Sequence, residues 1–297
     1  MSIRRFTAAL LLGSLLGLAT PAQAQQEGMA ARHRSFRATA TAFLKDAAPG
    51  ARKLFAEPGS RAGLIALGAV LERTKISRDL LKKTINNPHA YARREGWGDP
   101  MILPAIKALA RLGDISGARE VLERSAKSHK DEGSTRGALF EFVAGSAVKR
   151  MGYKLDGLSF QIGKYETDGV VEKKGGQPTF VNMKSISSQK VLKRVTDKAA
   201  DQLRKRNGTK AGRDGKLRNP ALLVIGKGAK VHLSRFDWAS VAKRSGADLT
   251  VISVDPQTAR GKVIFRRGVN QRLRRWMRHR LPTTSRLRAQ AKRRASR

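Results

Sequence analysis

The chain has 297 residues, of which 61 are Lys or Arg and 23 are Asp or Glu, so its formal charge is +38. A hydrophobic share of 40% is enough for a packed core and excludes a wholly disordered basic protein. The charge favours polyanionic partners such as nucleic acid, anionic lipid or acidic polysaccharide. The absence of cysteine excludes disulfide frameworks, cysteine-zinc sites, iron–sulfur clusters and thiol nucleophiles.

Residues 1–24 have the pattern of a bacterial secretory signal. Arg4 and Arg5 precede a short apolar run, Ala8–Leu18, and Ala22-Gln23-Ala24 supplies small residues at the usual cleavage spacing. The run is too short for an ordinary membrane span. The alternative to a cleaved signal is an uncleaved N-terminal anchor. We expect cleavage before Gln25, export to the periplasm or the medium, and no membrane span in the mature chain.

Residues 25–130 are expected to form a helical N-terminal region. The stretch Ile106–Ser125 has a helix–turn–helix layout around Gly113-Asp114 and resembles one hairpin of a tetratricopeptide-like repeat. No second copy follows at a fixed period, so a helical bundle is favoured over a repeat array. Apolar residues three and four apart predict helices at Arg61–Leu71, Asp79–Ile85 and Pro104–Leu112.

A polar, glycine-containing segment, His129–Ser134, is expected to be a linker to a domain at 135–265. In that domain a helix over Thr135–Met151 ends at Gly152. Helical and strand-like patterns then alternate, which predicts the α/β class. The expected strands are Leu158–Ile162, Glu166–Val171, Thr179–Met183, Ala221–Ile225, Leu249–Val254 and Val263–Phe265, and the expected further helices are Val191–Arg206 and Asp237–Ser245.

Residues 266–297 form an arginine-rich tail. From Pro256 to the end the chain has 15 Lys or Arg and no acidic residue, with Trp276 and Met277 among the arginines. The pattern fits a disordered cationic tail or a short helix that grips phosphates. In both cases the tail is attracted to polyanions.

The scarce acidic residues carry the chemical signal. Glu166 and Asp168 lie two apart on an expected strand and therefore point to the same side, as do Asn182 and Lys184 on the next strand. Glu141 is a lone acid within the apolar run LFEFVAG, and a carboxylate is costly to bury unless it is paired or bound to a cation. We expect Glu141, Asp168 and Lys184 to converge on one pocket.

This order of parts resembles the PD-(D/E)XK nuclease superfamily, over roughly Arg136–Arg206. GALFEFVAGSAVKRMGY resembles the family's first helix, YETDGVV its Asp strand, FVNMKSIS its carboxylate-x-Lys strand and VLKRVTDKAADQLRK the following helix, which carries Gln202. The finer resemblance is to toxin nucleases of bacterial competition systems. It implies a restriction-endonuclease-like mixed sheet flanked by helices, cleavage of DNA or RNA, and an immunity protein as partner.

The resemblance implies metal-assisted phosphodiester hydrolysis. Asp168, with Glu141 or Glu166, would hold Mg²⁺ or Mn²⁺, and Lys184 would orient water or stabilise the transition state. The departure is Asn182, where the family has Glu or Asp. It implies weaker metal binding, a migrated acid such as Glu172, or an inactive relative that binds nucleic acid or another polyanion. From the residues alone, Asp168 before Gly169 also fits a turn, Glu166 a solvated hairpin charge and Lys184 a surface lysine.

Overall fold

The computed structural model describes residues 21–93, 97–127, 131–162, 165–172, 178–207, 220–234 and 236–266. Most of the expected signal segment and the tail from residue 267 onward lie outside the described residues. Pro21–Ala24, the end of the expected signal, form the first turn of a helix.

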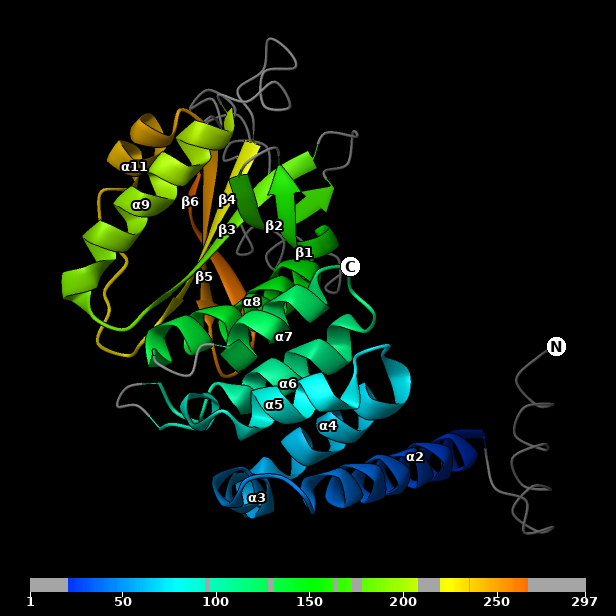
Figure 1. Cartoon of the computed structure of the whole chain (residues 1–297). Coiled ribbons are helices and arrows are strands. Elements are labelled where there is room, and N and C mark those ends of the chain that lie inside the picture. The colour runs from blue at the N-terminus through cyan, green and yellow to red at the C-terminus, as the bar shows by residue number, and fades with distance from the viewer. Residues whose placement is uncertain are drawn as a thin grey trace, which may run out of the picture.

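The N-terminal region is all helical, as the apolar spacing predicts. Its helices stack in layers below the sheet, with α2 farthest from α9 (Figure 1). The three predicted helices are confirmed as α4, α5 and α6, and the predicted turn at Gly113 separates α6 from α7. The elements are α2 (Pro21–Leu44), α3 (Pro49–Ala56), a 3₁₀ turn (Pro58–Ser60), α4 (Arg61–Arg73), α5 (Arg78–Asn86), a second 3₁₀ turn (Pro88–Ala90), α6 (Ile102–Leu112) and α7 (Ala118–Lys127).

Helix α8 (Glu132–Arg150) links this region to the sheet. Asp131 caps its start by accepting hydrogen bonds from the N–H groups of Gly133 and Ser134, at 2.8 and 3.2 Å. The prediction of a linker through Ser134 is therefore wrong from Asp131 onward, because its polar residues form a helix cap. Gly152, with a φ of +88°, follows the helix as predicted. Most of the 19 residues of α8 are buried, which places this helix inside the molecule.

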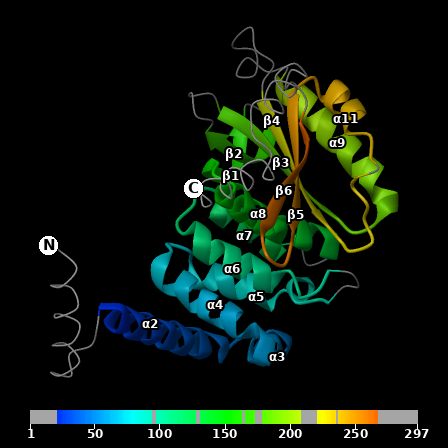
Figure 2. The ribbon, with the colours of Figure 1, turned by 180° about the vertical axis from the view of Figure 1, so that it is seen from behind.

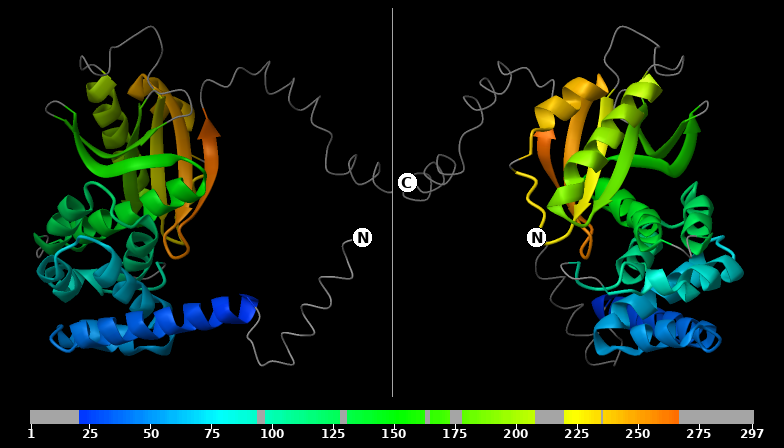
Figure 3. Two further views of the ribbon diagram at one scale, coloured as in Figure 1. Left: turned by 90° about the vertical axis from the view of Figure 1, so that its right-hand side faces the viewer. Right: turned by 60° about the vertical axis from the view of Figure 1, so that its left-hand side comes forward.

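Six strands form one mixed sheet in the order β1-β2-β3-β4-β5-β6 (Figure 3). The first three strands and the β5–β6 pair are antiparallel, whereas β3, β4 and β5 run parallel. The predicted α/β class is confirmed. The strands are β1 (Lys154–Ile162), β2 (Tyr165–Glu172), β3 (Pro178–Ile186), β4 (Pro220–Lys227), β5 (Asp248–Asp255) and β6 (Arg260–Arg266).

Helices cover both faces of the sheet, as views from opposite sides show (Figure 2). The crossover helices α9 (Gln189–Asn207) and α11 (Trp238–Ser245) pack on one face, against Ile186, Leu223 and Leu249. Helix α8 covers the other face, and its apolar residues join Val181, Met183 and Val224 in one cluster with α2–α7. The helical region and the α8 face of the sheet therefore share a continuous core.

No single helix in the described part of the chain is long and apolar enough to cross a bilayer; α3 and the segment Pro58–Arg73 reach that length only together, bent by 84°.

Candidate functional site

The candidate site lies where β2 and β3 separate. Their backbone pairing ends at Gly169 and Val181, and earlier residues of β2 pair with β1 instead. Side chains replace the missing backbone bonds: Thr167 Oγ1 donates to the carbonyl of Val181 at 2.9 Å, and the N–H of Met183 donates to Asp168 Oδ2 at 2.7 Å. The result is a strand fork with a carboxylate at its centre.

Asp168 and Lys184 form an ion pair in this fork. Lys184 Nζ lies 3.0 Å from Asp168 Oδ2, and the two side chains are only 20% and 14% exposed. Asp168 stands within β2 rather than in a turn, and Lys184 is no ordinary surface lysine. Both bonds to Asp168 reach Oδ2, so Oδ1 accepts no hydrogen bond from the described residues.

Glu141 brings a second carboxylate to the fork from α8. It is buried, and Arg124 donates to its Oε2 at 2.7 Å. Burial, followed by the charge of Asp168, raises the pKa of Glu141 to about 8, against the opposing effects of Arg124 and Lys184. The charges of Asp168 and Lys184 both act on Glu141, so these three residues share one electrostatic environment.

Glu166 joins the same group through Arg124. The guanidinium lies 3.5 Å from Glu166 Oε1, which also accepts a hydrogen bond from Ser159 Oγ at 2.8 Å. Ser159 has a φ of +54°, an uncommon conformation for a residue with a side chain. The Glu166 residue is exposed, so this acid is the part of the group nearest to solvent.

Arg124 is the residue that sequence reasoning missed. In the helix AREVLERSAK it looks like one more surface cation. The available signal was its position three residues after Val121, which points inward in an amphipathic helix. Burial lowers the pKa of Arg124, but Glu141, Glu166 and Asp168 raise it by more, so the guanidinium keeps its charge.

Asn182 and Gln202 form a separate pair under α9. Asn182 is fully buried, and its amide nitrogen donates to the carbonyl of Ala199 at 3.2 Å and to Gln202 Oε1 at 3.4 Å. Its position two residues before Lys184 puts it on the same strand face. These two contacts tie the Asn182 amide to α9.

Glu172, the other acid considered as a replacement, lies at the far end of β2. It pairs with Lys154 on β1, away from the fork. The idea of a carboxylate migrated to this position is therefore wrong.

The fork contains carboxylate oxygens, the type of ligand that Mg²⁺ and Mn²⁺ prefer. Glu141 Oε1 and Asp168 Oδ1 accept no hydrogen bond from the described residues, and Mg²⁺ commonly uses one or two carboxylates with water completing its shell. Within the described ranges, however, no three His, Asp or Glu side chains converge as a metal-binding group. Glu141 and Asp168 are two carboxylates of the kind that Mg²⁺ uses, and Arg124 and Lys184 at present meet their charge.

A row of exposed cations follows α9, and we call it the α9 basic row. Its members span about 22 Å at the helical rise of ~1.5 Å per residue. Two acids on the same face, Asp197 and Asp201, are held by Arg244 of α11 at 3.3 and 2.8 Å. Gln202 lines the same shallow hollow and links it to Asn182. The members are Lys190, Lys193, Arg194, Lys198 and Lys205.

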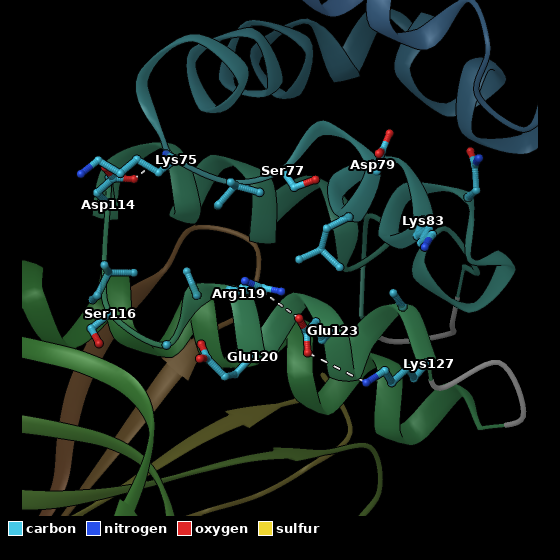
Figure 4. A pocket seen from close by; sticks show the side chains of 18 residues that line it. Lys75, Ser77, Asp79, Lys83, Asp114, Ser116, Arg119, Glu120, Glu123 and Lys127 are labelled. Carbon is cyan, nitrogen blue, oxygen red and sulfur yellow. Dashed lines mark hydrogen bonds and ion pairs between the residues drawn. The ribbon is translucent and has the colours of Figure 1, made fainter.

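A broader hollow, of about 1150 Å³, lies between α5 and α7 (Figure 4). Its charges largely satisfy one another: Glu123 pairs with Arg119 at 2.9 Å and Lys127 at 3.9 Å, and Asp114 accepts the N–H of Lys75. It contains none of the fork residues, so we place the chemistry at the fork.

The fork is described from the geometry of this chain alone. No protein-family model, curated protein or solved structure matches the chain.

Proposed function

We propose that the protein is a metal-dependent nuclease that hydrolyses phosphodiester bonds of DNA or RNA, built on a restriction-endonuclease-like core. The element order supports this fold: helix α8, three antiparallel strands, helix α9, and then β4 parallel to β3. This is the order of parts that the resemblance to the PD-(D/E)XK superfamily implies.

The observation that carries the proposal is the partly buried Asp168–Lys184 ion pair at the fork, with the buried Glu141 of α8 close enough for both charges to act on its pKa. Glu141, Asp168 and Lys184 come from α8, β2 and β3, so three separate elements are needed to assemble them. A buried carboxyl with a raised pKa beside a partly buried ion pair is typical of functional sites.

The chain's own residues have distinct roles in this proposal. Asp168 fixes the Lys184 ammonium, which has two further N–H donors for a phosphate oxygen and offsets the negative charge that develops there. Asp168 and Glu141 are the residues to hold the cation. A bound Mg²⁺ or Mn²⁺ would supply Lewis acidity and a water nucleophile at neutral pH.

The α9 basic row supplies a path for the substrate's phosphates. Its two acids share Arg244 and are outnumbered by the five cations of the row, so the row presents net positive charge. Gln202 connects the row to Asn182, two residues from Lys184 on the same strand face. A strand bound along α9 would thus be led toward the fork.

A second candidate is a nucleic-acid-binding protein without catalysis. One observation favours it: the buried Asn182 amide, at the position of the family's second carboxylate, is committed to α9. This candidate keeps the basic row and loses only the metal chemistry.

Export bears on the biological role. If the expected signal at residues 1–24 directs secretion, an exported nuclease fits an antibacterial toxin, and a dedicated immunity protein is then the expected partner.

The test is cleavage of plasmid DNA, total RNA and tRNA with Mg²⁺ or Mn²⁺. Asp168→Asn keeps an acceptor for the Met183 N–H but removes the charge, and Lys184→Met keeps the chain length. We expect each to lose at least about 100-fold in rate, as for removal of a transition-state charge. Glu172→Gln on the same strand is the matched control and should keep full activity.

Two outcomes contradict the proposal in different ways. Equal cleavage by wild type, Asp168→Asn and Lys184→Met assigns the activity to another site or to a contaminant. Tight, salt-sensitive binding without cleavage under either metal supports the binding protein instead.

A further inference from the structure

Arg124 reaches the fork from outside the α/β region. It lies on α7, in the N-terminal helical region, yet its guanidinium contacts Glu141 at 2.7 Å and Glu166 at 3.5 Å. The carboxyl of Glu141 is only 6% exposed, so this is not a surface contact made by chance between long side chains.

The backbone fixes α7 where Arg124 can make these contacts. The N–H of Leu158 on β1 donates to the carbonyl of Ser116 at 2.8 Å, just before α7 begins. Gly117 has a φ of +80°, and a Cβ there would lie 1.6 Å from the Leu158 carbonyl oxygen. Only glycine permits this approach, so the sequence commits α7 to the edge of the sheet next to the fork.

A guanidinium and a divalent cation bind the same kind of partner. Both are attracted by carboxylate oxygens, and a positive charge held at Glu141 repels a second cation at close range. The other carboxylate of the fork, Asp168, already has Lys184. The fork therefore carries an internal cation for each of its two inner acids.

We propose that Arg124 is an internal counter-cation of the fork, which competes with a divalent metal ion for Glu141 and Glu166 and lowers the metal affinity of the site. The side chain is 38% exposed, so it can turn toward solvent when a metal ion binds. The helical region thereby sets how much Mg²⁺ or Mn²⁺ the site requires. This inference rests on the cation site of the proposed function.

The experiment is Mn²⁺ binding at about pH 8.5, where Glu141 is ionised, by titration calorimetry or by the electron paramagnetic resonance signal of free Mn²⁺, on the full chain without nucleic acid. We expect Arg124→Gln to bind Mn²⁺ at least tenfold more tightly than wild type. Arg119→Gln is the matched control, because Arg119 is on the same helix, is exposed and pairs with Glu123 outside the fork. It should leave the affinity unchanged.

Further variants keep the inference open to refutation. Arg124→Gln/Glu141→Gln should lose the gain in affinity, because a metal-holding carboxylate is gone. If Arg124→Gln does not fold, Arg124→Lys serves instead, since a point charge cannot bridge two carboxylates and should give a smaller gain. Equal or weaker Mn²⁺ binding by the folded Arg124 variant, or no binding by any variant, overturns the inference.

The two proposals fail separately. Tighter Mn²⁺ binding by Arg124→Gln without any cleavage supports the counter-cation and removes the nuclease. Asp168-dependent cleavage with unchanged Mn²⁺ affinity in Arg124→Gln supports the nuclease and overturns the counter-cation.

Discussion

Glu141→Gln should change the pH dependence of stability. The pKa of Glu141 is raised from 4.5 to about 8, so between these values the folded protein holds a proton that the unfolded chain releases. Stability is therefore lost as pH rises through this window, and the loss is complete above pH 8. At ~1.4 kcal/mol per pKa unit, the upper limit is about 5 kcal/mol. Glutamine resembles the protonated acid and does not titrate.

The assay is urea unfolding of wild type and Glu141→Gln from pH 5 to pH 9, with EDTA present. Relative to wild type, the variant should gain stability steadily as pH rises. The total gain should be at least about 2 kcal/mol, close to half of the upper limit. Burying the glutamine amide adds a cost that does not depend on pH. It shifts the variant's whole curve of stability against pH but does not change the slope of that curve. Glu123→Gln is the control: the hydrogen bond from Arg119 lowers the pKa of Glu123, so its carboxyl stays ionised over this pH range and the variant should run parallel to wild type.

Parallel curves for wild type and Glu141→Gln over this range would refute the reasoning. They would mean that Arg124 keeps Glu141 ionised in the folded protein and outweighs both burial and Asp168.

Three further outcomes follow from the structure. Gly117→Ala should destabilise the protein by about 3 kcal/mol or more in urea unfolding, because its Cβ meets the Leu158 carbonyl, whereas Gly246→Ala, also at positive φ but in open space, should cost only about 1 kcal/mol. Replacing three members of the α9 basic row by Gln should reduce the salt dependence of nucleic-acid binding by about 2–3 units of slope in a fluorescence-anisotropy titration; the same change at three exposed arginines of α2 should have a smaller effect. The row variant is Lys193→Gln/Arg194→Gln/Lys198→Gln, and the α2 variant is Arg32→Gln/Arg34→Gln/Arg37→Gln. Mass spectrometry of protein recovered from the periplasm or medium should show a chain that begins at Gln25, and an intact Met1 would contradict the expected signal.

Local patterns predicted the elements but not how the chain brings them together. Alternation identified β2 and β3 correctly, and a lone acid in an apolar run identified Glu141. Glu172 fits the same alternation as Asp168, yet only the latter lies at the fork, because β2 leaves β3 at Gly169. Strand divergence is a property of three-dimensional pairing and leaves no period in the sequence.

Residues outside the resemblance to a nuclease were the hardest to predict. Arg124 lies beyond its boundary, and its role depends on α7 packing against α8 and on the close approach at Gly117. The polar run before α8 predicted a boundary, but its Asp131 is a helix cap. Composition marked that segment as a break because cap residues and linker residues are the same amino acids.

The burial of α8 has a consequence for how this protein can be rearranged by evolution or by engineering. One side of the helix packs on the sheet and the other on α6 and α7, so α8 lies in the middle of the core that the two regions share. A fragment that starts at Asp131 would leave the face of α8 that packs on α6 and α7 without its partners, and we expect it to aggregate. The α/β half is therefore not an independently folding unit. It can be fused to another protein only together with the helices that precede it.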